Sequence, residues 1–190
     1  MVIPRQLPAS REPPHHAATP IRTKRTLHGA LQTNMLTRYH WALISGPKKD
    51  DANVKGVRYD AKERITKSGK TEWYFEERRG GVDGNGMLLI RLIVAKVARP
   101  SELVHILRQV PVKQGVPGWN CVAWVNEALE KLEAHGKVLG THRTEWLDVT
   151  DTALWYVEKK KCEHRFDGQG DYDMSNVPTY DLMESKETVA

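Results

Sequence analysis

The segment from Thr37 to Ser45 reads Thr-Arg-Tyr-His-Trp-Ala-Leu-Ile-Ser, and the rest of the fold can be worked outward from it. Apolar and aromatic side chains occupy both alternating sets of positions, which is typical of a strand covered on both faces. Gly46-Pro47 ends the run. We therefore predict a central strand here, with His40 inside the sheet layer.

Three later runs extend this strand into a sheet. Val54 to Ala61 and Thr71 to Glu76, which contains Trp73-Tyr74-Phe75, are typical strand segments. Met87 to Val97 is a strongly apolar strand candidate. The glycine-rich stretch 80–86 lacks the Lys-Ser/Thr ending of a phosphate-binding loop and predicts a hairpin turn. The first three of these strands, from Thr37 to Glu76, are expected to form an antiparallel meander.

Helices are expected in the second half of the chain. Pro100 to about Gln109 begins with proline, and Asp151 to about Lys161 ends in three lysines that suit the helix dipole. The clearest helical pattern runs from Asn120 to His135, with apolar residues at 121, 124, 125, 128, 129 and 132. The fold class predicted is α+β, an antiparallel sheet with packed helices.

The length of 190 residues suits one domain. Residues 1–34 contain half of the ten prolines and many basic side chains, and we predict a flexible basic arm there. Residues 35–182 form the predicted single domain. The chain is expected to be irregular from Asp167 onward and disordered over 183–190.

The composition gives expectations for the cellular location of the protein and for its partners. The longest apolar run, within 87–98, is broken by Arg91 and Lys96, so we expect no membrane span. No apolar segment follows the basic residues near the N-terminus as in a secretory signal, which favours a cytoplasmic protein. The two cysteines, Cys121 and Cys162, are expected to be free thiols. The net charge of +5 gives only weak support to RNA binding.

Cys121 is the residue best placed for chemistry. It lies in the first turn of the clearest predicted helix, where unpaired N–H groups and the helix dipole favour a thiolate. A turn containing Gly115, Pro117 and Gly118 precedes it and can present N–H groups to an oxyanion. A thiol nucleophile needs a base, and of the eight histidines only His40 lies in a predicted central strand. A buried cysteine and a buried histidine are also ordinary core residues.

The two blocks together resemble a known family. His40-Trp-Ala-Leu is followed eighty residues later by Asn120-Cys121-Val-Ala-Trp-Val-Asn-Glu127. This order is similar to the lecithin:retinol acyltransferase and phospholipase/acyltransferase family, whose motif is Asn-Cys-Glu-His-Phe-Val. The resemblance implies a permuted papain-like (NlpC/P60-like) fold with the histidine strand before the cysteine helix. The blocks also resemble uncharacterised fungal proteins.

The resemblance extends to the residues around the pair. That family supplies a second histidine from the next strand, where this chain has Tyr59 and Asp60, and either is a candidate to orient His40. Trp119, Asn120 and Trp41 flank the pair and are candidates for substrate binding. The charged C-terminal segment lacks the family's apolar tail, which makes a lipid substrate less expected.

The sequence thus predicts cysteine-dependent acyl transfer or hydrolysis at an ester, thioester or amide carbonyl, without a cofactor. One alternative is an amide-forming biosynthetic enzyme with an aminoacyl donor, for which the basic arm would bind RNA. Another is a non-catalytic binding module on the same scaffold. Cys162 and His164 are too few ligands for a metal site.

Overall fold

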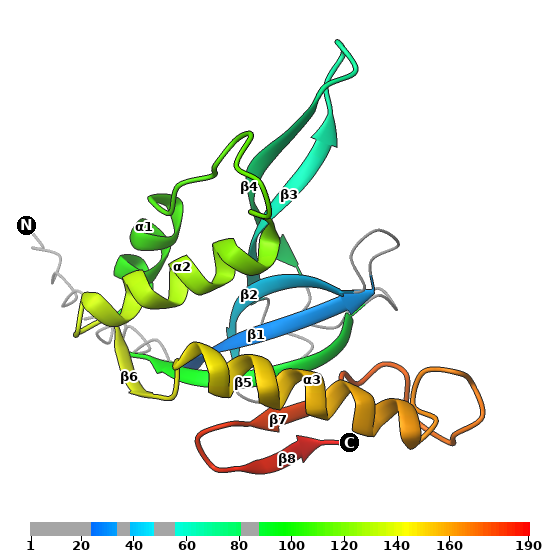
Figure 1. Cartoon of the computed structure of the whole chain (residues 1–190). Coiled ribbons are helices and arrows are strands. Elements are labelled where there is room, and N and C mark those ends of the chain that lie inside the picture. Colours follow the sequence, from blue (N-terminus) through cyan, green and yellow to red (C-terminus); the bar gives the residue numbers. More distant parts are fainter. Residues whose placement is uncertain (1–23, 34–38, 48–55, 81–87) are drawn as a thin grey trace, which may run out of the picture.

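The computed structural model describes residues 24–33, 39–47, 56–80 and 88–190. Eight strands and three helices lie within these ranges (Figure 1). In chain order they are β1 (Arg25–Thr33), β2 (Tyr39–Pro47), β3 (Gly56–Ile65), β4 (Thr71–Gly80), β5 (Leu88–Val97), α1 (Pro100–Arg108), α2 (Cys121–Ala134), β6 (Leu139–His142), α3 (Trp146–Cys162), β7 (Thr179–Asp181) and β8 (Lys186–Val189).

The strands form one sheet in the order β4-β3-β2-β1-β5-β7-β8, with β6 also paired to β5. All these neighbours are antiparallel except β5 and β7, which are parallel. The predicted α+β class and the antiparallel meander of β2, β3 and β4 are therefore confirmed.

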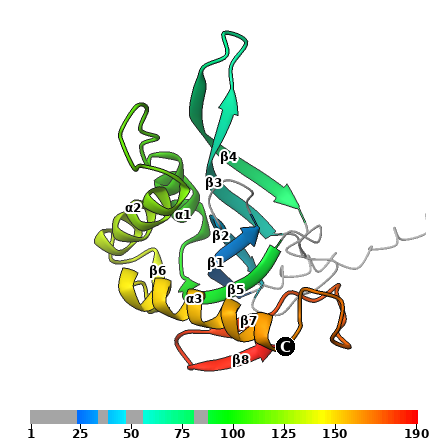
Figure 2. The same cartoon turned by 45° about the vertical axis from the view of Figure 1, so that its right-hand side comes forward.

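The helices and one face of the sheet enclose the main hydrophobic core. Side chains from every helix join alternate residues of β1, β2, β3 and β5 in one cluster, in which Leu31, Leu43 and Trp124 are fully buried. In Figure 2, α1 and α2 lie together on one side of the strands, and α3 runs along β5. The other face carries a small cluster of Ala30, Ala42, Ile44, Leu88 and Val177.

Two of the predicted boundaries are wrong. Residues 25–33, assigned to the flexible arm, form β1 between β2 and β5, and Leu27 and Leu31 are fully buried. Residues 186–189, assigned to a disordered tail, form β8, which pairs with β7. Both segments gain their order from pairing with other strands, β1 with β2 and β5 and β8 with β7, which local composition does not reveal. The arm over 1–23 and residues 81–86 lie outside the described residues. The hairpin predicted for the glycine-rich stretch is wrong, because β4 and β5 on either side of it are not neighbours in the sheet and β5 pairs with β1.

The predicted helices are present, with one boundary changed. The two earlier helices begin and end within one residue of the prediction. The last helix, α3, begins at Trp146 rather than near Asp151, because the Glu145 carboxylate accepts a hydrogen bond from the backbone N–H of Asp148 at 3.1 Å. In the described ranges no helix combines the length and the apolar character needed to cross a bilayer.

The placement of β1 in the core predicts the effect of a substitution on stability. Leu31→Ala should lower the free energy of unfolding by about 2–5 kcal/mol, because it removes a fully buried side chain from the core. Ile65→Ala is the control, since Ile65 is 78% exposed, and should change little. Urea unfolding followed by circular dichroism measures both. Equal stability of Leu31→Ala and the wild type would contradict the placement of β1 in the core.

Candidate functional site

The first turn of α2 presents Cys121. The Asn120 side chain caps the helix, and its Oδ1 accepts hydrogen bonds from the backbone N–H groups of Val122 (2.9 Å) and Ala123 (3.3 Å). Two residues earlier, Gly118 has a φ of 78°, a conformation that glycine adopts readily and that turns the chain into the helix. Cys121 is therefore the first helical residue, and it is 3% exposed.

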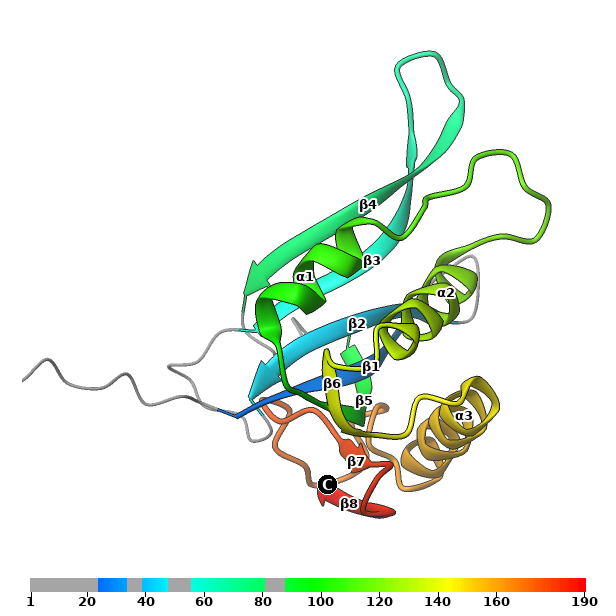
Figure 3. The ribbon, with the colours of Figure 1, turned by 90° about the vertical axis from the view of Figure 1, so that its left-hand side faces the viewer.

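The sheet opens beside this helix end. Among the described residues, β2 pairs with β3 only through Leu43, Ile44 and Ser45, whereas β3 and β4 pair over ten residues each. The β3–β4 hairpin therefore leaves β2 and projects from the body of the protein (Figure 3). α2 contacts both β2 and β3. His40, the second residue of β2, pairs with Gln32 of β1 but lies beyond the part of its strand that pairs with β3.

The His40 ring contacts both proposed partners. Its Nε2–H donates to Oδ2 of Asp60 at 2.7 Å, and the Cys121 thiol lies near enough to raise the pKa of the ring. Because Nε2 is occupied by Asp60, Nδ1 is the nitrogen left for the thiol. Burial by itself lowers the pKa of His40, but the hydrogen bonds and the charges of Asp60 and Cys121 raise it to about 9.

Asp60 is the buried anion of this cluster. Its side chain has no exposed surface, and the same Oδ2 atom lies 3.1 Å from Nη2 of Arg58. Arg58 also donates from Nη1 to Oε1 of Gln32 at 3.1 Å, and its Nη2 lies 3.5 Å from Oε2 of Glu76. The carboxylate is thus held between the imidazole and a guanidinium, as a buried charge requires.

Tyr59, the other candidate to orient His40, points to the opposite face. Neighbouring residues of a strand alternate between faces, and Tyr59 packs in the main core, stacked on Phe75 at 6.5 Å between ring centroids. Burial, followed by the charge of Glu77, raises the pKa of Tyr59 to about 12. Asp60 alone of the two contacts His40 in the described structure.

The three candidates for substrate binding have different surroundings. Trp119 lies edge-on to Trp73, with 5.5 Å between ring centroids, and its Nε1–H donates to Oε1 of Glu127 at 3.0 Å. The oxygen of the Asn120 side chain is used by the helix cap. Trp41 is 4% exposed and packs against Trp146 in the core, away from the His40 ring.

The sequence analysis missed two residues of this cluster. Arg58 lies two positions before Asp60 on the same strand, so strand alternation would have placed both on one face. Gln32 was missed because it was assigned to the arm.

His164, weighed with Cys162 as a metal ligand, forms a hydrogen bond with Oδ2 of Asp167 at 2.7 Å. Within the described ranges, no three His, Cys, Asp or Glu side chains gather as a metal site would require.

The fold and these contacts define an α+β protein with a Cys121–His40–Asp60 cluster at the junction of a helix end and an opened sheet. The chain belongs to a family described as a family of unknown function (DUF6914), whose model matches residues 24–189. The matched span begins one residue before β1 and includes every strand and helix described above. No curated protein and no solved structure matches the chain.

The contact between His40 and Asp60 predicts a pH dependence. In the wild type His40 should titrate near pH 9, and in Asp60→Asn nearer the ordinary value of about 6.5. The raised pKa stabilises the folded protein below about pH 6.5, and this contribution is lost as the pH rises through about 9. The stability difference between wild type and Asp60→Asn should therefore shrink from pH 6.5 to above 9. Histidine NMR titration and urea unfolding measure these effects, with His40→Gln to assign the signal. A wild-type midpoint near 6.5 would contradict the prediction.

The cap on α2 gives a second prediction. Asn120→Ala should cost about 1 kcal/mol of unfolding free energy, because two N–H groups at the helix start lose their acceptor. Asn120→Ser keeps a capping oxygen and should retain most of that stability. Urea unfolding compares the two variants. If both lose stability equally, capping is not the role of this side chain.

Proposed function

We propose that this protein is a cysteine-dependent acyltransferase or hydrolase with a permuted papain-like arrangement. The observation that carries the proposal is the 2.7 Å hydrogen bond from His40 to the buried Asp60, on a ring whose pKa is also raised by the nearby Cys121 thiol. A nucleophile, a base and a group that orients the base are the three parts that thiol acyl transfer requires.

The chemistry would run in two halves. His40, with its pKa raised to about 9, holds the proton of the Cys121 thiol as an imidazolium, and the sulfur attacks as a thiolate the carbonyl carbon of an ester, thioester or amide. The bond to the leaving group breaks, and that group receives the proton from His40, which leaves an acyl group on Cys121. Water or an amine then attacks the acyl carbon while His40 accepts its proton, and the thiol is released with the proton returned.

Asp60 has a defined part in this cycle. Its carboxylate accepts from Nε2–H of His40, which fixes the tautomer so that Nδ1 faces the thiol. The negative charge also favours the imidazolium that forms when Cys121 loses its proton. This carboxylate stands where the acyltransferase family that the sequence resembles has a second histidine.

The start of α2 offers a donor for the oxyanion. Asn120 occupies the N–H groups of Val122 and Ala123 but not that of Cys121. Within the described ranges the Cys121 N–H has no recorded acceptor. An N–H at a helix start, next to the nucleophile, suits the negative oxygen of a tetrahedral intermediate.

A non-catalytic binding module is the second candidate, and one observation favours it. Cys121 is only 3% exposed, as a packed core thiol would be. The two candidates differ in the reactivity of the thiol, which a small electrophile measures directly.

The test is the pH dependence of Cys121 alkylation by iodoacetamide in a Cys162→Ala background, which removes the exposed second thiol. We expect labelling to continue at pH 6, well below the ordinary cysteine pKa of about 8.5. Adding His40→Ala should slow labelling at pH 6 about tenfold or more, because the thiolate loses its cationic partner. Labelling that needs pH above 8 and ignores His40 would favour the binding module.

Turnover is tested separately with an activated ester such as p-nitrophenyl acetate. Intact mass spectrometry should detect an acetyl group on Cys121 in the Cys162→Ala protein. The adduct should be missing from the Cys121→Ser variant in the same background. A reactive thiol that never carries an acyl group would contradict the acyl-transfer mechanism.

A further inference from the structure

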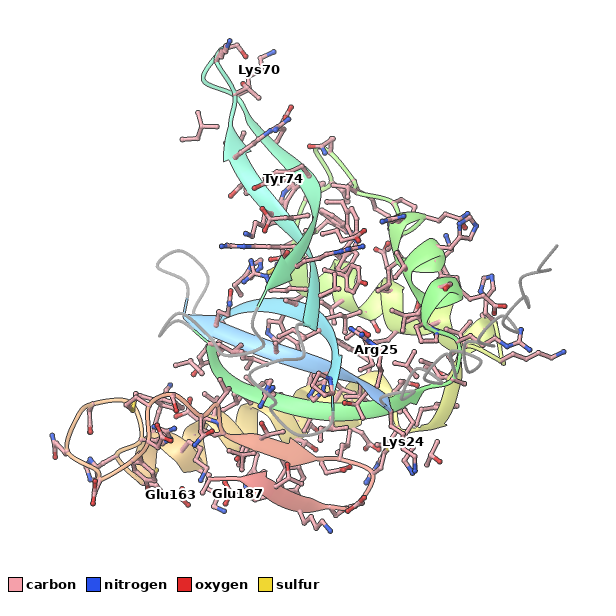
Figure 4. The ribbon with its side chains drawn as sticks, turned by 180° about the vertical axis from the view of Figure 1, so that it is seen from behind. Lys24, Arg25, Lys70, Tyr74, Glu163 and Glu187 are labelled. Carbon is pink, nitrogen blue, oxygen red and sulfur yellow. The ribbon has the colours of Figure 1, made fainter. Side chains whose placement is uncertain are left out.

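Arg58 links three strands beside the cluster. Its guanidinium reaches Gln32 on β1, Asp60 on β3 and Glu76 on β4, and its side chain is 19% exposed. Figure 4 views the sheet from the side opposite to that of Figure 1, with Tyr74 and Lys70 marking the β3–β4 hairpin. Because cross-strand partners share a face, Arg58, Asp60 and Glu76 belong to one polar row on β3 and β4.

Each of the two carboxylates in this row, Asp60 and Glu76, has a basic side chain beside it. Nζ of Lys62 lies 2.5 Å from Oε2 of Glu76, which commits Glu76 mainly to Lys62. Arg58 is then the permanent cation of Asp60, at 3.1 Å from Oδ2. His40 shares this oxygen, and Oδ1 of Asp60 has no partner among the described residues. Asp60 thus depends on two cations, of which only His40 can lose its charge.

The sharing of Asp60 Oδ2 between Arg58 and His40 affects how strongly His40 holds its proton. If His40 were the only cation near a fully buried carboxylate, its proton would be retained to neutralise Asp60, and the ring would be a poor base. A guanidinium on the same oxygen neutralises Asp60 whatever the state of His40. The guanidinium thereby limits how far Asp60 raises the His40 pKa, and the imidazole keeps the ability to exchange its proton with Cys121.

We propose that Arg58 is a positioning residue that neutralises Asp60 and so leaves His40 able to give up and regain its proton. The inference rests on the proposed function for its catalytic meaning. The other groups at this place are the Cys121 thiol from α2, the uncharged Gln32 from β1, and Lys62, Glu76 and Arg78 from the polar row.

The experiment compares Arg58→Gln with the wild type by NMR titration of His40 in the full chain. Loss of the cation should raise the His40 midpoint by about one pH unit or more. Arg58→Lys keeps the charge and should give a smaller shift. Arg78→Gln is the matched control, because Arg78 is the exposed register partner of Arg58 on β4, and it should shift nothing. An unchanged midpoint in folded Arg58→Gln overturns the inference.

The double variant Arg58→Gln/Asp60→Asn keeps the inference testable if Arg58→Gln alone does not fold. If Arg58 acts through Asp60, Arg58→Gln should no longer raise the His40 midpoint once Asp60 is replaced. If Arg58→Gln alone is unfolded, refolding in the double variant supports the inference, because the defect then traces to the uncompensated carboxylate. A double variant that is also unfolded overturns it. The titration needs no turnover, so an unreactive Cys121 would defeat the proposed function while the shift still decides the role of Arg58.

Discussion

The buried carboxylate of Asp60 sets the arrangement of the site. A charged side chain without exposed surface requires partners of opposite charge and hydrogen-bond donors, because it has lost its hydration. Arg58 and His40 meet this requirement from two strands and on one oxygen atom. The bond to Nε2 also fixes the direction of the imidazole ring and leaves Nδ1 for the thiol. The orientation of His40 is therefore a consequence of how Asp60 is neutralised.

The second constraint is the short pairing between β2 and β3. Three residue pairs join these strands, and the ten-residue hairpin of β3 and β4 then departs from the sheet. His40 belongs by alternation to the sheet face away from the main core, whereas α2 packs against the core face. In a continuous sheet the strands would separate the two sides. The opening beyond Leu43 lets a side chain of β2 reach Cys121, so the site exists where regular strand pairing stops.

The sequence predicted those parts of this structure whose signals are local. β2 to β5 and α2 carry strand or helix periodicity, and Cys121 was placed at a helix start from its neighbours alone. β1 was missed because Arg25, His28 and Gln32 interrupt its apolar residues and a proline-rich segment precedes it. β7 has three residues and pairs with the distant β5, and β8 has four residues and pairs with β7. The pairing of His40 with Cys121 was proposed from the place of His40 in a central strand and from the resemblance, since nothing local reveals where β2 and β3 separate. The choice between Tyr59 and Asp60 needed the register of β3 against β2.

The polar residues near Cys121 are the main argument for the proposed thiol chemistry over a core cysteine. A cysteine that only fills space needs apolar neighbours, and Trp124, Val125 and Leu129 on the same helix provide them. It gains nothing from a histidine, a fully buried carboxylate and a guanidinium. Replacing such buried ionic groups by apolar residues is commonly neutral or stabilising, by about 1–4 kcal/mol. Stability alone therefore gives no reason for this set of groups, whereas proton exchange with a thiol requires a base that is oriented and an anion that is already neutralised. The electrostatic arrangement, more than the position of the cysteine itself, is the physical argument for a catalytic role.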